Sequence, residues 1–542
     1  MRLLENLIAA TLAVGLFACS SDEPGNGAND SPQNRDGVYS SISFRFPTVR
    51  SEASEGVEVG KNYENNVGSI LVVMADKNDA GEYTFISYAL NDAPITNATT
   101  NTYTVTFQDK EALFERAENT VYIFAYCNPT ETLRSTIAGN INPASGSYEG
   151  GLSSGDKFTD EIFSGDVYST WKNNGFLMSS VEVVEKQLPS KDELKTYNSS
   201  KNALNLGTVT VQRTMSRFDF RDAADKDTPL TYAIKNPENE DEIQGSVKFI
   251  RVALFNLADR FYYLPRTKAD AASEIKLCPG MAGMEQGYVI SADGRQYSES
   301  LPERIDPLNP TAELKWTDLE AILGLDEDED EGWGDNVDPS ADKLGYHIWR
   351  YASENTFGPG IENGITNTTG YVFEAEILVD ANFGNVDADG QKQVMYLYRD
   401  ILYPNAMAIA DAVAEVPVST LATAFENAFD ITRDADGKVV SATPKSDEAV
   451  ENMGFTAYKP NAQGKYLCYY FAFNKHNDNL DPTSVGAMEY ATVRNNVYKL
   501  AVTTVKKFGT FTPTQDVEEW DTYFTLDVQV LPWVVRINNL DF

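Results

Sequence analysis

Few side chains in this sequence have the types and spacing that enzyme chemistry requires. Only two histidines occur, His347 and His476, and each lies beside aromatic or loop-forming residues. The chain has no nucleophile elbow, phosphate-binding glycine loop, dinucleotide fingerprint or His-Glu-x-x-His zinc motif. Its cysteines and histidines are too scattered to predict a metal centre. We therefore expect no catalytic residue, no metal and no cofactor, and a protein that is not an enzyme.

Three acidic segments are candidates for a calcium site. Residues 326–331 are consecutive carboxylates, but they lack the alternating ligand spacing and the turn glycine of a dedicated calcium loop. Residues 387–390 and 434–437 both read Asp-Ala-Asp-Gly between strand-like runs. Asp-Gly is first a hairpin signal, because glycine adopts positive φ without steric cost. We favour a solvated loop for the first segment and hairpin turns for the other two.

The composition limits the classes of partner. The chain has 542 residues, 44 Lys and Arg against 81 Asp and Glu, and a net charge of −37. This charge argues against nucleic acid and anionic membrane surfaces, because phosphate contacts need Lys and Arg. A hydrophobic fraction of 42% is sufficient for real cores, and the length suits two domains plus a leader.

The N-terminus predicts export and lipidation. Residues 7–17 form an apolar run too short to span a bilayer, which is typical of a signal peptide. The run ends in Leu-Phe-Ala-Cys19, which resembles the lipobox of bacterial lipoproteins, where the cysteine becomes the acylated first residue. An ordinary signal peptide that contains a cysteine is the alternative. Residues 22–36 are rich in Gly, Asn, Pro and Ser and are expected to be a tether. The remaining cysteines, Cys127, Cys278 and Cys468, are odd in number, which favours buried free thiols over disulfides.

Short β-type runs separated by Gly, Asn, Asp and Pro turns dominate the rest of the chain. This pattern predicts a mostly β fold, with two tandem β-sandwich domains of transthyretin-like, Greek-key type. Helical spacing is limited to short stretches, best at residues 110–118, 314–323 and 420–429. The expected divisions are a signal peptide (1–18), a lipidated propeptide with the first strand (19–50), an N-terminal sandwich (51–206), a C-terminal sandwich (207–521) and a C-terminal segment (522–542).

The first strand is marked by Ile42, Phe44 and Phe46, which alternate with polar residues. Arg50 follows it and precedes a small, acidic, polar stretch that begins at Ser51, an accessible site for an Arg-specific protease. Cutting this bond would release the lipid anchor and the first strand together. Emptying a strand slot would lose burial on the order of 6–12 kcal/mol. Arg35 and Arg45 are competing cleavage sites, but the first lies before the strand and the second inside it.

The last twenty residues form a strand pattern that must bury one face. Apolar and polar residues alternate up to Pro532, and a second alternation follows it. The apolar positions are Phe524, Leu526, Val528, Val530, Trp533 and Val535. Chain ends are usually polar and frayed, so this segment packs either in its own domain or in another copy. Its length and alternation suit the slot that the first strand would vacate.

The block Met-Glu-Tyr-Ala-Thr-Val-Arg-Asn-Asn-Val-Tyr-Lys-Leu at residues 488–500, with the closing Pro532-Trp533 tail, resembles the C-terminal signature of Bacteroidetes fimbrillins. The similarity is nearest to the minor-fimbrium subunits. It implies two β-sandwich domains, lipidation at Cys19, cleavage between Arg50 and Ser51, and a donor segment at residues 522–542. Assembly would be head-to-tail, by exchange of the first strand for a neighbour's tail.

This resemblance implies a cell-surface fimbrium built from an outer-membrane lipoprotein precursor. The expected partners are further copies of the chain, anchor and tip subunits, an Arg-specific maturation protease, and a host or bacterial receptor, in support of adhesion and biofilm formation. Two alternatives stay open. One is a non-polymerising fimbrial anchor or accessory lipoprotein, and the other is a surface glycan-binding lipoprotein, which would need exposed aromatic residues on one face.

Overall fold

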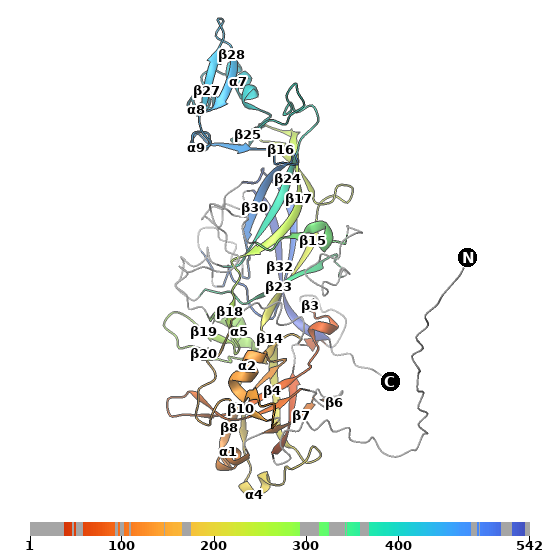
Figure 1. Ribbon diagram of the computed structural model, residues 1–542, viewed down its shortest axis with the longest axis vertical. Helices are drawn as coiled ribbons and strands as arrows, with labels where there is room; N and C mark the ends of the chain where they lie inside the picture. Colours follow the sequence, from red (N-terminus) through yellow and green to blue (C-terminus); the bar gives the residue numbers. More distant parts are fainter. Residues whose placement is uncertain are drawn as a thin grey trace, which may run out of the picture.

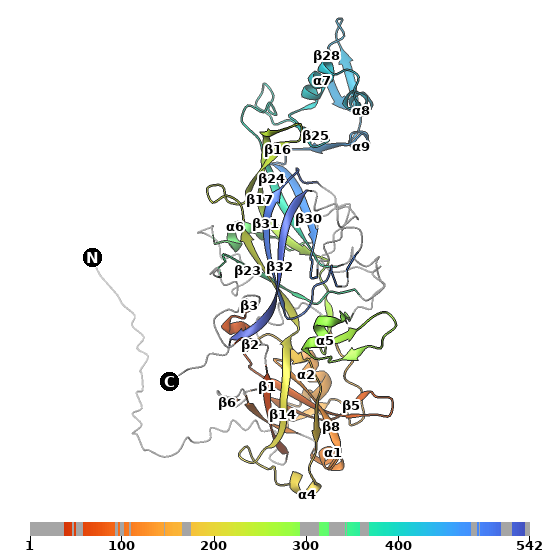
Figure 2. The same cartoon turned by 180° about the vertical axis from the view of Figure 1, so that it is seen from behind.

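The computed structural model describes residues 37–45, 48–49, 58–92, 96–97, 102–107, 110–145, 147–164, 175–292, 314–324, 342, 344–357, 368–477, 485–486, 488–510 and 523–536. These residues form an elongated molecule with three units along its long axis (Figure 1). An N-terminal β unit lies at one end, a β-sandwich in the middle and a small α/β unit at the other end. The view from behind has the same order (Figure 2). The prediction of a mostly β protein is confirmed.

The N-terminal unit is a sheet that closes on itself. Its strands are β1 (Val38–Arg45), β4 (Ile70–Lys77), β5 (Tyr83–Asn91), β6 (Thr96–Asn97), β7 (Thr102–Phe107), β8 (Thr120–Cys127), β12 (Met178–Ser180), β13 (Val184–Gln187) and β14 (Leu204–Arg213). The order β1-β14-β12-β8-β4-β5-β7 returns to β1, because β1 pairs with β7 as well as with β14. The first strand therefore closes the ring.

The ring packs apolar residues on both faces. Alternate residues of β1, β4, β7, β8 and β14 point inward, where Ile42, Val72, Val105 and Ile123 form one core. The outer face of β4 and β8 packs against α2 (Glu131–Ala138). This helix begins where the hydroxyl of Thr130 accepts a hydrogen bond from the amide of Leu133. The smaller elements are α1 (Lys110–Glu115), α4 (Lys191–Leu194) and the pair β9 (Gly139–Ile141) and β10 (Tyr148–Gly150).

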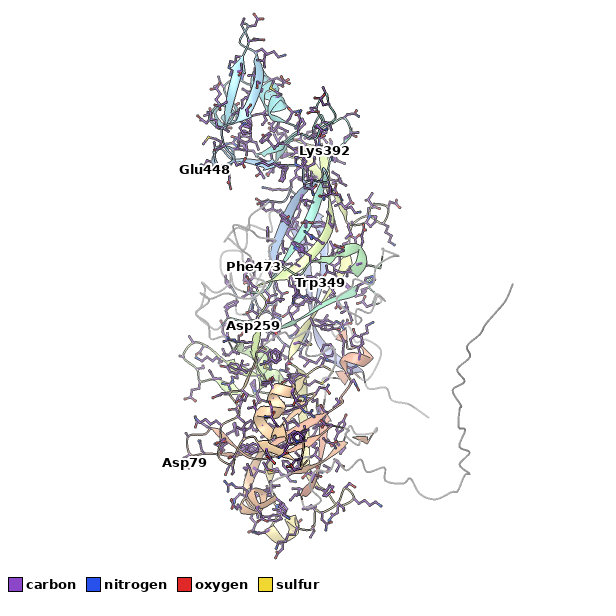
Figure 3. The ribbon with its side chains drawn as sticks, viewed as in Figure 1. Asp79, Asp259, Trp349, Lys392, Glu448 and Phe473 are labelled. Atoms are coloured by element: carbon purple, nitrogen blue, oxygen red, sulfur yellow. The ribbon has the colours of Figure 1, made fainter. Side chains whose placement is uncertain are left out.

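The middle unit is a β-sandwich. One sheet contains β2 (Thr48–Val49), β32 (Phe524–Arg536), β31 (Asn496–Val505), β15 (Met215–Asp222) and β23 (His347–Ser353), with β3 (Glu58–Val59) paired to β32. The other contains β16 (Thr231–Asn236), β17 (Asn239–Phe255), β24 (Gly370–Leu378) and β30 (Tyr466–Phe473), with β22 (Thr317–Asp318) paired to β17. Aromatic residues from both sheets fill the core, and Trp349 is only 1% exposed in it (Figure 3).

Short elements complete the sandwich and its border with the N-terminal ring. They are η1 (Asn62–Glu64), α6 (Leu319–Ile322), α5 (Met281–Gln286), the pair β11 (Ile162–Ser164) and β18 (Arg260–Tyr262), and the sheet of β19 (Arg266–Lys268), β20 (Lys276–Leu277) and β21 (Tyr288–Val289). Cys127, Cys278 and Cys468 are buried free thiols, as predicted. Among the described residues, no helix is long and apolar enough to cross a membrane.

A third unit interrupts the sandwich between β24 and β30. It contains β25 (Met395–Tyr398), β26 (Ile401–Tyr403), α7 (Ala406–Glu415), α8 (Thr420–Ala428), β27 (Phe429–Arg433), β28 (Val439–Pro444), α9 (Asp447–Asn452) and β29 (Phe455–Tyr458). Its helices begin at the capping side chains Asn405, Ser419 and Ser446. The inserted unit has its own apolar core and carries Glu448 on its surface (Figure 3).

The strands β14 and β15 show where the N-terminal ring ends and the sandwich begins. β14 lies wholly in the N-terminal ring, whereas β15 lies wholly in the sandwich. The expected boundary between residues 206 and 207 falls inside β14. We therefore propose that the chain passes from one unit to the next at Thr214, and that the inserted unit is a separate part of the C-terminal region.

Candidate assembly site

The first strand occupies a slot with a strand on each side. β1 runs parallel to β14, with Phe44 opposite Val209, and antiparallel to β7, with Ile42 opposite Tyr103. Its buried and half-buried residues alternate, as its sequence predicts. The inward side chains of Val38, Ile42 and Phe44 are 2%, 0% and 4% exposed.

Removal of β1 would open the ring and leave two unpaired strand edges. At roughly 1.5–3 kcal/mol for each buried apolar side chain, Val38, Ile42 and Phe44 contribute about 5–9 kcal/mol. The amides and carbonyls of β7 and β14 that face β1 would also lose their partners. An open ring would therefore bind another strand of matching alternation strongly.

The first half of the tail strand packs in its own sandwich. β32 pairs antiparallel with β31 from Phe524 opposite Val505 to Pro532 opposite Asn496. Phe524 is 1% exposed, and its ring lies 5.4 Å from that of Tyr470 and 6.0 Å from that of Phe373, measured between centroids.

Leu526 and Val528 pack against the same core. The side chains of Val530, Trp533 and Val535 lie outside the described part of the structure, although their backbone belongs to β32. Cys19, Phe46, Arg50 and Ser51 also lie outside the described residues. The lipidation site, the cleavage site and the donor segment stay predictions.

A cluster of buried charges links residues 58–64, which follow the predicted cleavage site, to the sandwich. The Arg217 guanidinium forms a two-point contact with Asp219 and also contacts Glu58 at 2.7 Å and Glu64 at 3.1 Å. The Lys499 ammonium lies 2.7 Å from the second oxygen of Glu58. The side chains of Arg217, Glu64 and Lys499 are 1%, 0% and 2% exposed.

The electrostatics of this cluster favour the charged forms of its two basic groups. Burial alone would lower the pKa of Arg217, but the carboxylates of Asp219, Glu64 and Glu58 outweigh burial and raise it well above its usual value. Burial likewise opposes the charge of Lys499, while its hydrogen bonds to Asp342 and Glu58 raise its pKa overall. The cluster was not predicted from the sequence. The only signal is that Lys499 interrupts the apolar run of β31, whereas Arg217 precedes Phe218 in a strand of mixed apolar and charged residues.

Arg494, in the block that resembles fimbrillins, forms a second buried ion pair near the border between ring and sandwich. Its guanidinium donates to both oxygens of Glu354 at 2.8 and 3.0 Å and to the carbonyl of Tyr262 at 2.8 Å. The next residue, Asn495, has φ of 59° and donates its backbone amide to the carbonyl of Met215, 2.7 Å away. This part of the block therefore fixes the region where the ring passes into the sandwich.

The two histidines lie in different parts of the sandwich. His347 lies in β23, and Nδ1 of His476 lies 3.0 Å from the Tyr498 hydroxyl. Burial lowers the pKa of His476 to about 4, so its imidazole is neutral at physiological pH. Among the described residues, no group of His, Cys, Asp and Glu is arranged to hold a metal.

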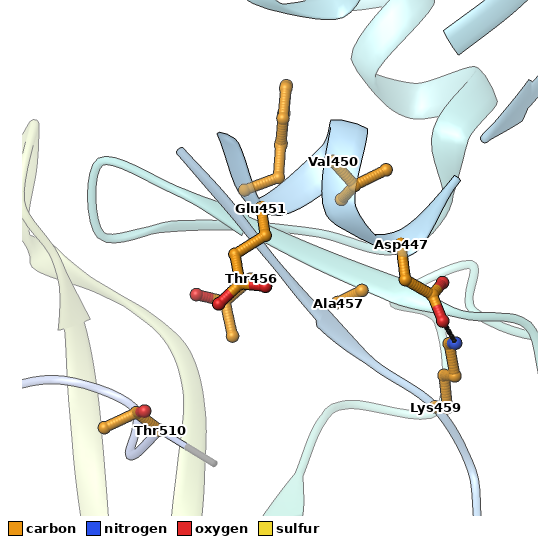
Figure 4. A pocket seen from close by; sticks show the side chains of 8 residues that line it. Asp447, Val450, Glu451, Thr456, Ala457, Lys459 and Thr510 are labelled. Carbon is orange, nitrogen blue, oxygen red and sulfur yellow. Dashed lines mark hydrogen bonds and ion pairs between the residues drawn. The ribbon is translucent and has the colours of Figure 1, made fainter. Parts of the chain in front are cut away.

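An open pocket of about 380 Å³ lies between the inserted unit and the sandwich (Figure 4). Its lining contains neither histidine nor cysteine, and Asp447 is paired with Lys459 at 2.7 Å. Thr456 and Thr510 supply hydroxyl groups.

The two Asp-Ala-Asp-Gly segments form hairpin turns, as predicted. The carboxylate of Asp387 accepts from the amides of Asp389 and Gln391, and Gly390 has φ of 79°. Asp434 accepts in the same way from Asp436 and Lys438. Residues 326–331 lie outside the described part of the chain.

The decisive comparison concerns the strands around the tail. Residues 464–539, which include β30, β31 and β32, match the family described as "Major fimbrial subunit protein type IV, Fimbrillin, C-terminal". Residues 464–539 are thus similar to the C-terminal region of fimbrillins. The predicted resemblance to Bacteroidetes fimbrillins is confirmed. The fimbrillin region holds one outer strand of each sheet, β30 and β32, and the buried Arg494.

Several solved structures are similar to this chain. A Parabacteroides distasonis protein with a provisional role in cell adhesion is 12% identical with a TM-score of 0.38, and the alignment covers 92% of this chain and 97% of that one. A fimbrilin from Porphyromonas gingivalis is 10% identical with a TM-score of 0.34, covering 93% and 99%. The tip fimbrial protein Mfa3 from Porphyromonas gingivalis is 10% identical with a TM-score of 0.31, covering 92% and 99%. TM-scores of this size carry no argument about function. No curated protein matches the chain.

Proposed function

We propose that this protein is a structural subunit of a cell-surface fimbrium. It is exported as a lipoprotein with Cys19 as the lipidated residue, cut between Arg50 and Ser51, and polymerised by strand exchange. The tail of one subunit enters the ring of the next, in the slot that β1 leaves. Adhesion and biofilm formation are properties of the resulting fibre.

The observation that carries this proposal is the double pairing of β1. A single strand closes the N-terminal ring between β14 and β7, and it lies directly before the predicted cleavage site in sequence. The match of residues 464–539 to fimbrillins supports the same function from the other end of the chain. Main-chain pairing would supply affinity, and alternate side chains would supply register. Because the contact is head-to-tail, it builds an open filament.

The packing of Phe524, Leu526 and Val528 in their own sandwich indicates which part of the tail is exchanged. These three side chains would leave a cavity in their own core if they moved to a neighbour. We therefore propose that the exchanged part begins after Val528, while Phe524, Leu526 and Val528 stay packed in their own sandwich.

The experiment is to treat purified precursor with an Arg-specific protease and to look for oligomer ladders that survive mild SDS. A protein truncated after Pro532 keeps the β31–β32 pairing and should be cut without forming ladders. Arg50→Ala should block both cutting and ladders. Ladders from the truncated protein would contradict the tail as donor, and normal cutting of Arg50→Ala would contradict the cleavage site.

The same experiment distinguishes a polymerising subunit from a fimbrial anchor, because an anchor would resist cutting and keep its lipid. No observation favours the glycan-binding alternative. Among the described residues, the large apolar side chains that are well exposed are all Ile, Leu or Val, and none is aromatic.

A further inference from the structure

The end of the tail strand has different partners from its beginning. Beyond Pro532, Trp533 and Val534 pair in parallel with β3, and Val535 and Arg536 pair in parallel with β2. Within the described part of the chain, these two short strands are the only strand partners of that end. The Arg50–Ser51 bond falls between β2 and β3 in sequence. The tail end is therefore held by one segment before the predicted cut and by one segment after it.

The segment after the cut is firmly attached. Glu58, in β3, bridges Arg217 and Lys499 with contacts of 2.7 Å to each. Six residues on, Glu64 contacts Arg217 and accepts a hydrogen bond of 2.7 Å from the hydroxyl of Tyr351. Buried ion pairs of this kind are costly to break, because each remaining charge loses its partner. β3 would therefore stay in place when the chain is cut.

The segment before the cut has a different fate. β2 follows β1 closely in the chain and is joined to it covalently. Its strand pairing in the described structure is with β32 alone. A cut after Arg50 would leave β2 on the same fragment as β1, so the departure of β1 would remove β2 from the tail.

We propose that β2 is an autoinhibitory latch on the donor tail, an inference that rests on the proposed function. In the uncut precursor, Thr48 and Val49 hold the backbone of Val535 and Arg536, so the tail end cannot enter a neighbour. One cut then prepares both partners of the exchange. It opens the ring by releasing β1, and it frees Val535 and Arg536 by releasing β2. The two-residue pairing of Trp533 and Val534 with β3 is then the last strand contact that the tail end must give up.

The latch is tested by separating donor from acceptor. The acceptor is the cut protein truncated after Pro532, which has an open ring and no tail end. The donors carry a fluorescent label and Arg50→Ala, so their own rings stay closed. One donor carries only that change, a second adds Thr48→Pro and Val49→Pro, and a third adds Thr48→Ala and Val49→Ala. Proline removes the amides that a strand pairing needs, whereas alanine keeps them.

The proline donor should form SDS-resistant heterodimers about tenfold faster than the donor with Arg50→Ala alone, as expected for the loss of one or two hydrogen bonds. The alanine donor should stay within about twofold of the latter. Unchanged thermal unfolding of the proline donor would show that β1 stays in its ring. Equal rates for the proline and Arg50→Ala donors would overturn the latch, although labelled cut wild-type protein would still join the acceptor. If that cut donor also fails to join, the proposed strand exchange itself is wrong.

Discussion

At the scale of single residues, the charges around Arg217 are the main unexpected feature. Three carboxylates, from Glu58, Glu64 and Asp219, converge on one guanidinium in a largely buried site. The pairing brings residues from the start of the chain onto a strand that lies far from them in sequence. Its place at the border between ring and sandwich indicates a role in fixing that joint.

Removing the central charge should destabilise the protein strongly. Arg217→Met keeps most of the volume but leaves buried carboxylates without a partner, which costs roughly 3–5 kcal/mol. The measurement is the free energy of unfolding of the precursor in urea. The matched control is Lys459→Met, because the Lys459–Asp447 pair has side chains 55% and 79% exposed. That change should cost less than about 1 kcal/mol. Equal effects of the two variants would contradict a structural role for the buried cluster.

The buried His476 should make the free energy of unfolding depend on pH. Burial lowers its pKa from 6.5 to about 4, so the unfolded chain binds a proton in this range that the folded chain does not. Its contribution to stability is therefore complete above pH 6.5 and decreases as the pH falls toward 4, by up to about 3 kcal/mol. His476→Gln should reduce this slope, measured as the free energy of unfolding between pH 4 and pH 7. A variant with the same slope as the wild type would contradict the assignment.

At the scale of elements, the alternating strands were the part that the sequence predicted best. The period of two in residues 42–46 and in residues 524–530 identified β1 and β32, because each buries one face. The closure of the ring was not predictable in this way. It depends on pairings of β1 with β7 and β14, and periodicity carries no information about which strands meet.

The inserted unit was missed for a related reason. The helical spacing of residues 420–429 was predicted and corresponds to α8, but it did not reveal that α8 belongs to a separate core. Local spacing reports which face of a helix is buried, not against which element. The charged cluster was likewise hidden, since Arg217 is one of several charged residues in its strand and the sequence does not identify its partners.

The slot of β1 gives a prediction that separates precursor from mature protein. Ile42 is fully buried, so Ile42→Ala should destabilise the precursor by about 2–5 kcal/mol. The same variant should have no effect after cutting and departure of β1, because the altered strand is gone. Thermal unfolding before and after protease treatment checks this, with Ser41→Ala as the control. An equal loss in both forms would mean that β1 stays bound after the cut.

At the scale of the whole molecule, the inserted unit lies at the end opposite the N-terminal ring (Figure 1). Met395 and Tyr458 are opposite each other in the β25–β29 pairing, so their backbones are adjacent. Replacing residues 396–457 by Asn-Gly, a two-residue hairpin turn, should therefore keep the sandwich folded, although it removes Leu397 and Leu402 from the edge of its core. We expect this variant to form ladders at the wild-type level after cutting. A folded variant that forms none would show that the inserted unit takes part in assembly.

The central claim is that a neighbour's tail enters the slot of β1, and disulfide trapping tests it most directly. Asn205 lies opposite Ser41 in the β1–β14 pairing and is exposed, so a cysteine there reports on the slot. It is combined with single cysteines at positions 533 to 536 of the tail. The account predicts intermolecular disulfides only after cutting, at positions that alternate with Trp533 and Val535, because the sequence alternation predicts that those two would face the neighbour's core. No disulfide after cutting, or the same disulfides in the uncut precursor, would contradict it.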